Sequence, residues 1–195
     1  MRRLERLGST VETCRRFGRL QSSLSTPPCD PGEEQPGRKQ RRRKLCAATA
    51  TRPEQAIDIA IRVLLAPGDE VWVEDPGYPL THAQLLLAKA RPHPIPVDAH
   101  GLIVDAGLRT APRARAAFLT PSHQFPTGVA LSMARRLELL TWARRSGAFI
   151  VEDDYTSELR YSGPPLASLQ GLDDTEQVIY VGTLNKALFP GLRIG

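Results

Sequence analysis

Three residues near the end of the sequence have side chains suited to chemistry with a carbonyl compound and a phosphate. Lys186 follows an apolar stretch, and Thr183 and Arg193 lie three residues before it and seven after it. A lysine amine that is partly removed from water has a lowered pKa, which makes it a candidate nucleophile that forms a Schiff base. A hydroxyl and a guanidinium are suitable ligands for a phosphate group.

Two more candidates follow the apolar run at residues 148–152. Asp153 could hold a protonated pyridine nitrogen through a charge-assisted hydrogen bond, and Tyr155 could offer its hydroxyl to a phenolic oxygen. Each of these residues alone is more often a solvated loop residue or a packing residue. Their joint occurrence with Lys186 favours a functional interpretation, because an amine, an acid, a phenol and a phosphate grip are together what pyridoxal phosphate requires.

Helical and β-type patterns alternate along the part of the chain that carries these residues. Helices are predicted from Pro53 to about residue 66, over residues 80–90, and over residues 132–147 with Ser132 as N-cap and Gly147 just past the end. Strands are predicted at residues 70–74, 113–120, 148–152 and 177–182, and residues 91–97 read as an extended piece interrupted by prolines.

The predicted strands are nearly apolar throughout, which indicates an α/β fold with a mainly parallel sheet and helices on both faces. Polar or Gly/Pro-rich clusters follow four of the strands, at residues 75–79, 121–128, 153–155 and 183–186. Ligands of open α/β sheets bind outside the carboxyl ends of the strands. If the strands are parallel, all four clusters meet at one edge of the sheet, where we expect the site.

The N-terminal quarter differs in composition from the rest. Residues 1–52 carry 13 Lys and Arg against 5 Asp and Glu, a net charge of +8, whereas residues 53–195 carry 13 against 16, a net charge of −3. We expect residues 1–50 to be a disordered, low-complexity basic segment. Within it, residues 38–44 read as a solvated charge run in preference to a phosphate-binding or localisation signal. The body is not predicted to bind nucleic acid.

Cysteine usage and hydropathy bound the location. Cys14, Cys29 and Cys46 are odd in number and form no CxxC motif, so we expect no disulfide framework or metal site and a cytoplasmic protein. No apolar run approaches the roughly 20 residues that span a bilayer, and we expect no membrane partner.

Four stretches resemble the aminotransferase-like domain of MocR-type regulators of the GntR family, within the fold-type I, aminotransferase class I/II superfamily. They are "VWVEDPGYP", "TPSHQFPTGVALSMARRLELL", "IVEDDYTSELRYSGPPLASLQGLD" and "VIYVGTLNKALFPGLRIG". The resemblance runs from about Pro53 to Gly195, so residues 51–195 are expected to form part of the large domain of a pyridoxal-phosphate-dependent transferase.

The resemblance implies roles for individual residues. Lys186 matches the lysine that forms the internal aldimine with pyridoxal 5'-phosphate, and Asp153 matches the acid that keeps the pyridine nitrogen protonated. Tyr155 matches the tyrosine near the phenolic oxygen, and Tyr78 matches the aromatic residue beside the cofactor ring. The expected phosphate ligands are Thr183 and Arg193.

Two departures from the family pattern bear on the cofactor. Residues 51–54, Thr-Arg-Pro-Glu, replace a Ser-Gly-Ser/Thr-Gln phosphate loop, and Pro53 offers no N–H while Glu54 adds negative charge. One lost charge-assisted hydrogen bond costs roughly 1.5–3 kcal/mol, or about ten- to a hundredfold in affinity, which Arg52 would partly offset. Phe125 stands where ordinary aminotransferases have asparagine, so Ser122, His123 or Gln124 is expected to contribute instead.

The resemblance implies a pyridoxal-phosphate-binding domain that acts on a small amino compound, and by analogy a homodimer. The alternatives are the effector-sensing domain of a MocR/GntR-type transcription regulator, or an inactive fragment. Residues 1–52 show no winged helix-turn-helix pattern, so DNA binding is expected only through a module absent from this sequence. The arginine-bearing small domain of the superfamily is absent too, and we therefore expect cofactor binding rather than full transamination.

Overall fold

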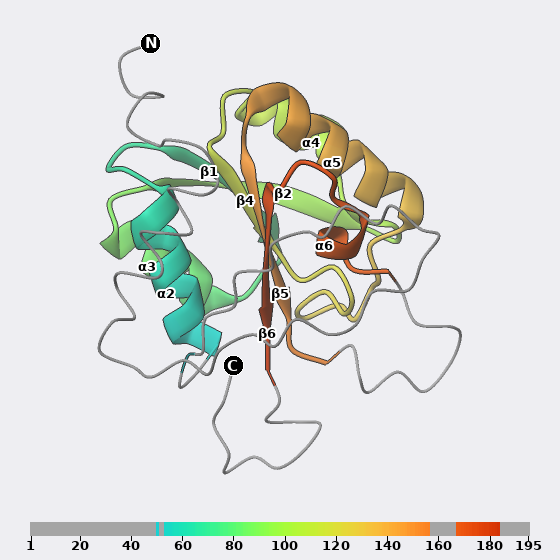
Figure 1. The fold of residues 1–195 in the computed structure, drawn as a ribbon, viewed down its shortest axis with the longest axis horizontal. Helices are drawn as coiled ribbons and strands as arrows, with labels where there is room; N and C mark the ends of the chain where they lie inside the picture. The colour runs from blue at the N-terminus through green and yellow to red at the C-terminus, as the bar shows by residue number, and fades with distance from the viewer. Residues whose placement is uncertain (1–49, 51–52, 157–166, 184–195) are drawn as a thin grey trace, which may run out of the picture. The chain divides into compact units, whose positions relative to one another are not determined.

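The computed structural model describes residue 50, residues 53–156 and residues 167–183 (Figure 1). The helices in these ranges are α2 (Pro53–Leu64), α3 (Pro79–Leu87), α4 (Val104–Thr110), α5 (Met133–Ser146) and α6 (Leu169–Leu172). The strands are β1 (Glu70–Asp75), β2 (Arg91–Asp98), β3 (Gly101–Leu102), β4 (Ala116–Leu119), β5 (Phe149–Asp154) and β6 (Val178–Gly182).

The described strands form one six-stranded sheet in the order β3-β2-β1-β4-β5-β6. Every neighbouring pair is parallel except β2 and β3, which are antiparallel. The prediction of a mainly parallel sheet is confirmed. Because β1, β4, β5 and β6 run in the same direction, the segments that follow them start from the same edge of the sheet, also as predicted.

Strand β2 is continuous although three of its eight residues are proline. Pro92, Pro94 and Pro96 alternate along it, so the positions without an N–H all face the same side of the strand. Pro96 accepts a hydrogen bond from the Ile103 N–H, 3.0 Å away, on the side away from β1. The prolines thus leave the ladder to β1 intact, and the predicted interruption of this segment does not occur.

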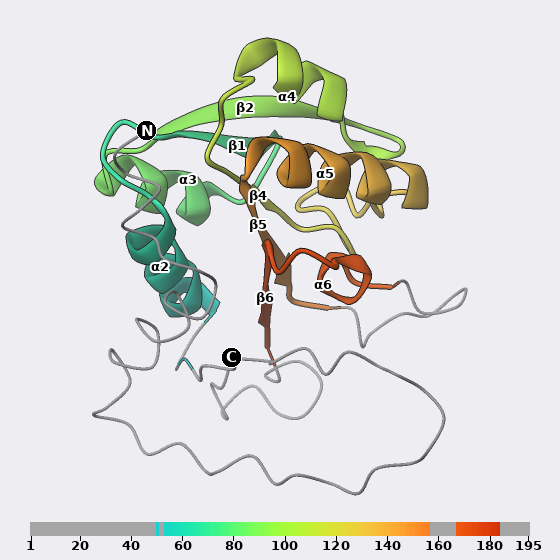
Figure 2. The ribbon, with the colours of Figure 1, turned by 45° about the horizontal axis from the view of Figure 1, so that its top comes forward.

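Helices cover both faces of the sheet, as Figures 1 and 2 show. Helices α2 and α3 pack on one face against Val71, Val73 and Val151. Helices α4, α5 and α6 pack on the other face, in a cluster that includes Trp72 and Ile150. Successive strand residues therefore point to opposite layers, and this alternation determines which polar side chains reach a given face.

Helix α5 has the boundaries that its sequence predicts. The Ser132 side chain accepts a hydrogen bond from the Arg135 N–H, and Gly147 ends the helix in the left-handed conformation with φ +67°. Arg136, fully buried in this helix, donates to the carbonyl oxygens of Leu131 and Pro121. The start of α5 is thereby fixed to the segment that leaves β4.

Helix α4 was not predicted from the sequence, and it depends on a close approach to β1. A Cβ atom on Gly107 would lie 2.7 Å from the Trp72 ring, so only glycine fits there. Trp72 stacks on Trp142 with ring centroids 3.9 Å apart, and its Nε1 donates to the Ala111 carbonyl oxygen at 2.9 Å. These contacts pack α4 and α5 together against β1.

The disorder expected for residues 1–50 falls, except for residue 50, outside the described residues. None of the described helices has the length and apolarity needed to cross a membrane.

Candidate functional site

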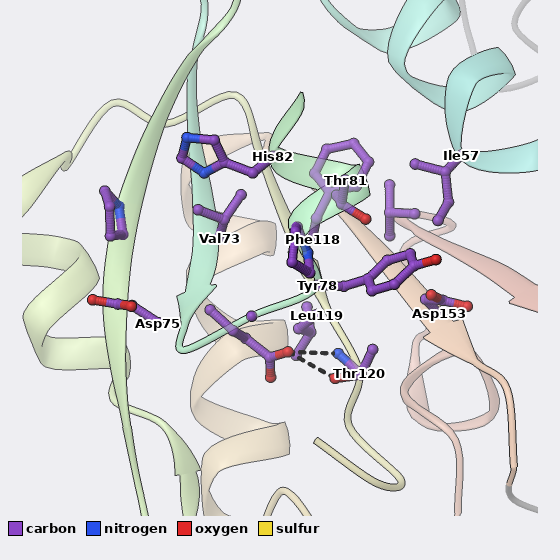
Figure 3. A pocket seen from close by; sticks show the side chains of 15 residues that line it. Ile57, Val73, Asp75, Tyr78, Thr81, His82, Phe118, Leu119, Thr120 and Asp153 are labelled. Atoms are coloured by element: carbon purple, nitrogen blue, oxygen red, sulfur yellow. Dashed lines mark hydrogen bonds between the residues drawn. The ribbon is translucent and has the colours of Figure 1, made fainter. Parts of the chain in front are cut away.

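A cleft of about 310 Å³ opens at the carboxyl ends of β1, β4 and β5, on the side covered by α2 and α3 (Figure 3). Side chains from β1, the segment after it, β4, β5 and the two helices line it. Its polar and aromatic members include Glu74, Asp75, Tyr78, His82, Thr120 and Asp153. The cleft therefore lies at the sheet edge where the sequence predicts a site, and its volume suits a small ligand.

Strand alternation determines which of two neighbouring acids reaches the cleft. Asp153 is half-buried and lines it, together with Val151 of the same strand. Asp154 points to the opposite layer, where the Tyr180 hydroxyl donates to its Oδ2 at 3.0 Å. The acid that the sequence selected as the partner of a pyridine nitrogen is thus the one that faces the cleft.

Tyr78 lies in the segment after β1, and its ring points into the cleft in the region of Asp153 (Figure 3). The Phe125 ring forms a T-shaped pair with this ring, with centroids 5.4 Å apart and an interplanar angle of 79°. Desolvation, followed by the negative charge of Glu54, raises the pKa of the Tyr78 hydroxyl, which lies 3.5 Å from Glu54 Oε1. Tyr78 therefore stays protonated at neutral pH and offers an aromatic face.

Glu74 also lines the cleft, although it is not among the residues predicted from the sequence. Its Oε2 accepts hydrogen bonds from the Thr120 backbone N–H at 3.0 Å and from the Thr120 hydroxyl at 2.8 Å, drawn as dashed lines in Figure 3. Burial raises the pKa of Glu74 to about 7, and the nearby charge of Asp153 adds to the rise. The available signal was an acid at the end of the apolar run "VWVE", directly before Asp75.

The Tyr155 hydroxyl is hydrogen-bonded to the segment that follows β4. It donates to the His123 carbonyl oxygen at 2.9 Å, and Thr156 Oγ1 lies 3.1 Å from His123 Nδ1. These contacts tie the segment after β5 to the segment after β4. The expected role of Tyr155 towards a phenolic oxygen stays a prediction.

Gln124 holds the segment after β4 against the segment after β1. Its Nε2 donates to the Pro76 carbonyl oxygen at 2.7 Å, and its Oε1 accepts from both the backbone N–H and the hydroxyl of Thr127. Gln124 is one of the three residues expected to contribute in place of an asparagine. Its hydrogen bonds join the segment after β1 to the segment after β4. The other two residues are His123, whose carbonyl oxygen accepts from Tyr155 in the segment after β5, and Ser122, which is buried.

The remaining sequence candidates are only partly described. Thr183 directly follows β6 and is half-buried, whereas Lys186 and Arg193 lie outside the described residues. In the altered phosphate loop, Pro53 begins α2 and Glu54 lies in its first turn, where the Glu54 carbonyl oxygen accepts from Gln84 Nε2 at 3.0 Å.

The cleft offers a carboxylate at a strand end and an aromatic ring, between apolar walls from Ile57, Val73 and Phe118. This combination suits a flat heteroaromatic group that carries a proton on a ring nitrogen. No cluster of three or more potential metal ligands occurs among the described residues.

The chain is similar to known proteins in sequence and in fold. Residues 51–195 match the family "Aminotransferase class I and II". A similar curated protein is the "Probable rhizopine catabolism regulatory protein MocR" of Rhizobium meliloti, 46% identical over 142 residues, which are 73% of this chain and 28% of that protein. Aromatic-amino-acid aminotransferase 1 of Thermococcus litoralis is 34% identical over 159 residues, 78% of this chain and 38% of that enzyme.

Among solved structures, kynurenine aminotransferase of Pyrococcus horikoshii superposes with a TM-score of 0.72 and 35% identity, over 75% of this chain and 38% of that one. The chain thus spans about a third of the length of the relatives it matches. Because the family match covers most of the sequence, this chain belongs to the aminotransferase class I and II family.

Proposed function

We propose that residues 51–195 are a pyridoxal-phosphate-binding, aminotransferase-like domain in which Lys186 bonds covalently to the cofactor and an amino compound is the substrate. The observation that carries the proposal is the pairing of Asp153 and Tyr78 in one cleft at the carboxyl ends of the strands. A solved relative, LysN of Thermus thermophilus, is 33% identical to this chain and was crystallised with N-(5'-phosphopyridoxyl)-L-leucine bound.

The residues present fit this cofactor. Asp153 would hold the proton on the ring nitrogen, Tyr78 would contact the ring, and Thr183 and Arg193 would bind the phosphate. Bound in this way, pyridoxal phosphate supplies an electron sink for carbanionic chemistry. Lys186 would move the proton at the substrate carbon, and Tyr155 would orient groups near the phenolic oxygen.

A second candidate function is favoured by the identity of the relatives. Besides the MocR protein, an HTH-type transcriptional regulator of Rhodobacter capsulatus, TauR, is 41% identical over 70% of this chain. The same cleft would then detect an amino compound for a transcription regulator, with DNA bound by a module outside this sequence. Both proposals include a homodimer, a cytoplasmic location and a domain boundary near residue 50.

The covalent role of Lys186 is testable by spectroscopy. Wild type mixed with pyridoxal phosphate is expected to develop a visible absorption band, and Lys186→Ala is expected to lack it. Lys89→Ala serves as the control, because Lys89 is exposed in the turn between α3 and β2 and does not line the cleft. Identical spectra for wild type and Lys186→Ala would refute the assignment.

The two candidate functions differ in turnover. Loaded protein is incubated with a panel of amino acids while the visible band and the oxo-acid product are measured. Oxo-acid formation supports the enzyme, whereas a spectral change without oxo-acid supports the sensor.

A further inference from the structure

A buried polar chain joins the end of β1 to residues 120–128, which we call the β4 loop. Glu74 accepts two hydrogen bonds from Thr120, through the backbone N–H and the hydroxyl. The Thr120 hydroxyl oxygen in turn accepts from the Phe125 N–H at 3.0 Å. Thr120 thus connects Glu74 to Phe125 by hydrogen bonds, although these two residues are 51 positions apart in the sequence.

A second connection runs between the same two segments. Gln124 donates to the carbonyl oxygens of Pro76 and Phe125, at 2.7 Å and 2.6 Å. Its own backbone is fixed by the bond from the Gln124 N–H to the Val129 carbonyl oxygen. Both connections therefore reach the Phe125 backbone, and the second also holds Pro76, two residues before Tyr78.

The depth of these groups makes the connections costly to break. Glu74, Thr120 and Gln124 expose 8%, 5% and 2% of their surface. Water cannot readily replace a lost partner there, so removing one leaves a desolvated polar group that costs roughly 1–3 kcal/mol. The position of the β4 loop therefore depends on these hydrogen bonds.

The two segments that this network joins carry the aromatic pair Tyr78 and Phe125. Tyr78 lines the cleft together with Asp153, and the Phe125 ring packs against it in a T-shaped pair. Gly77, between Pro76 and Tyr78, approaches the Glu74 carbonyl oxygen so closely that an added Cβ would clash with it. Glu74 thus contacts the turn before Tyr78 through its backbone and the β4 loop through its side chain.

We infer that Glu74 is a positioning residue of this site, which acts through Thr120 to fix the β4 loop and thereby hold the Tyr78–Phe125 pair against the cofactor ring. This inference rests on the proposed function for the identity of the ring. The bracing of the loop itself is a property of the chain without cofactor.

The test uses pairs of variants that separate hydrogen bonding from shape. Thr120→Val removes the hydroxyl at nearly constant volume, and Thr120→Ser keeps it. Glu74→Leu removes the acceptor, and Glu74→Gln keeps an acceptor oxygen. Should Glu74→Leu fail to fold, the Thr120 pair still decides the question.

The first readout is hydrogen exchange of the β4 loop in the full chain without cofactor. One lost bond of about 1.4 kcal/mol corresponds to about tenfold faster exchange. We expect this rise in Thr120→Val and Glu74→Leu, and near wild-type rates in Thr120→Ser and Glu74→Gln. Unchanged exchange in Thr120→Val would overturn the inference.

The second readout is the affinity for pyridoxal phosphate and the circular dichroism of the bound cofactor at saturation, which reports ring orientation. Thr120→Val is expected to bind about tenfold more weakly and to give an altered signal per bound cofactor. Faster loop exchange with unchanged affinity and dichroism would show a merely structural role and overturn the inference. If the wild type binds no cofactor, the proposed function fails, and the exchange rates alone decide whether Glu74 braces the loop.

Discussion

At the scale of single residues, two carboxylates in the cleft have different surroundings. Glu74 is buried and hydrogen-bonded by Thr120, and its pKa is raised to about 7. Asp153 is half-buried at the end of β5 and faces the open cleft. The first is suited to holding structure in a partly protonated form, and the second to pairing with a cationic ring nitrogen.

The raised pKa of Glu74 predicts a pH-dependent stability. Between the unfolded value of 4.5 and the folded value of about 7, the folded state binds more protons, so this group's contribution to the unfolding free energy falls as pH rises. Relative to Glu74→Gln, wild type is expected to lose on the order of 3 kcal/mol from pH 4.5 to pH 8. Urea unfolding across this range measures the difference, and parallel curves for the two proteins would contradict it.

The neighbouring acids of β5 provide a matched pair for cofactor binding. Asp153→Asn removes a charge that faces the cleft, so pyridoxal phosphate is expected to bind about ten- to a hundredfold more weakly. Asp154→Asn alters the opposite layer, where Tyr180 donates to it, and is expected to leave the affinity near that of wild type. Titration of the cofactor band measures both, and equal losses in the two variants would reject the assignment of Asp153.

At the scale of elements, the position of the cleft depends on how helices pack on the two faces of the sheet. Helix α4 contacts β1 through Gly107 and Trp72, and β1 carries Glu74 at its end. On the other face, Ile57 of α2 is part of the apolar wall of the cleft, and Tyr78 precedes α3 as its N-cap residue. Because β1 contacts α4 on one face and ends at the cleft, a change in the packing of α4 is expected to shift the cleft residues of β1.

Gly107→Ala tests the packing of α4. The added methyl group would lie 2.7 Å from the buried Trp72 ring, and such overpacking costs roughly 1–3 kcal/mol of unfolding free energy. Alanine has a higher helix propensity than glycine, which would by itself raise the stability. A measured gain in unfolding free energy would therefore show that the packing penalty is absent and would contradict the prediction. Arg109→Ala, at an exposed position of the same helix, is the control and is expected to change little. Thermal or urea unfolding measures both variants.

At the scale of the whole molecule, parallel strand direction brings together residues that are far apart in sequence. Glu74 and Thr120 are separated by 46 residues, and Tyr155 and His123 by 32. The loops after β1, β4 and β5 are thereby hydrogen-bonded to one another around one cleft. The family relationship agrees with this arrangement, although the chain spans only about a third of the relatives it matches.

The alternation of helices and strands, the parallel sheet and the caps of α5 were all predictable from local patterns. Ser132 and Gly147 act within one helical turn, and apolar strands with polar ends indicate a ligand edge whatever their order. Asp153 and Tyr78 were selected by motif, and the structure places both in the cleft.

The environment of each group, in contrast, emerged only from the packed fold. The proline-rich β2 is a full strand because its missing N–H groups all face away from β1, and α4 forms where a glycine meets Trp72. The pKa of Glu74 and the partner of the Tyr155 hydroxyl depend on burial and on contacts across the sheet. Sequence periodicity reports which face a residue occupies, whereas desolvation and distant hydrogen bonds exist only once the strands are in register.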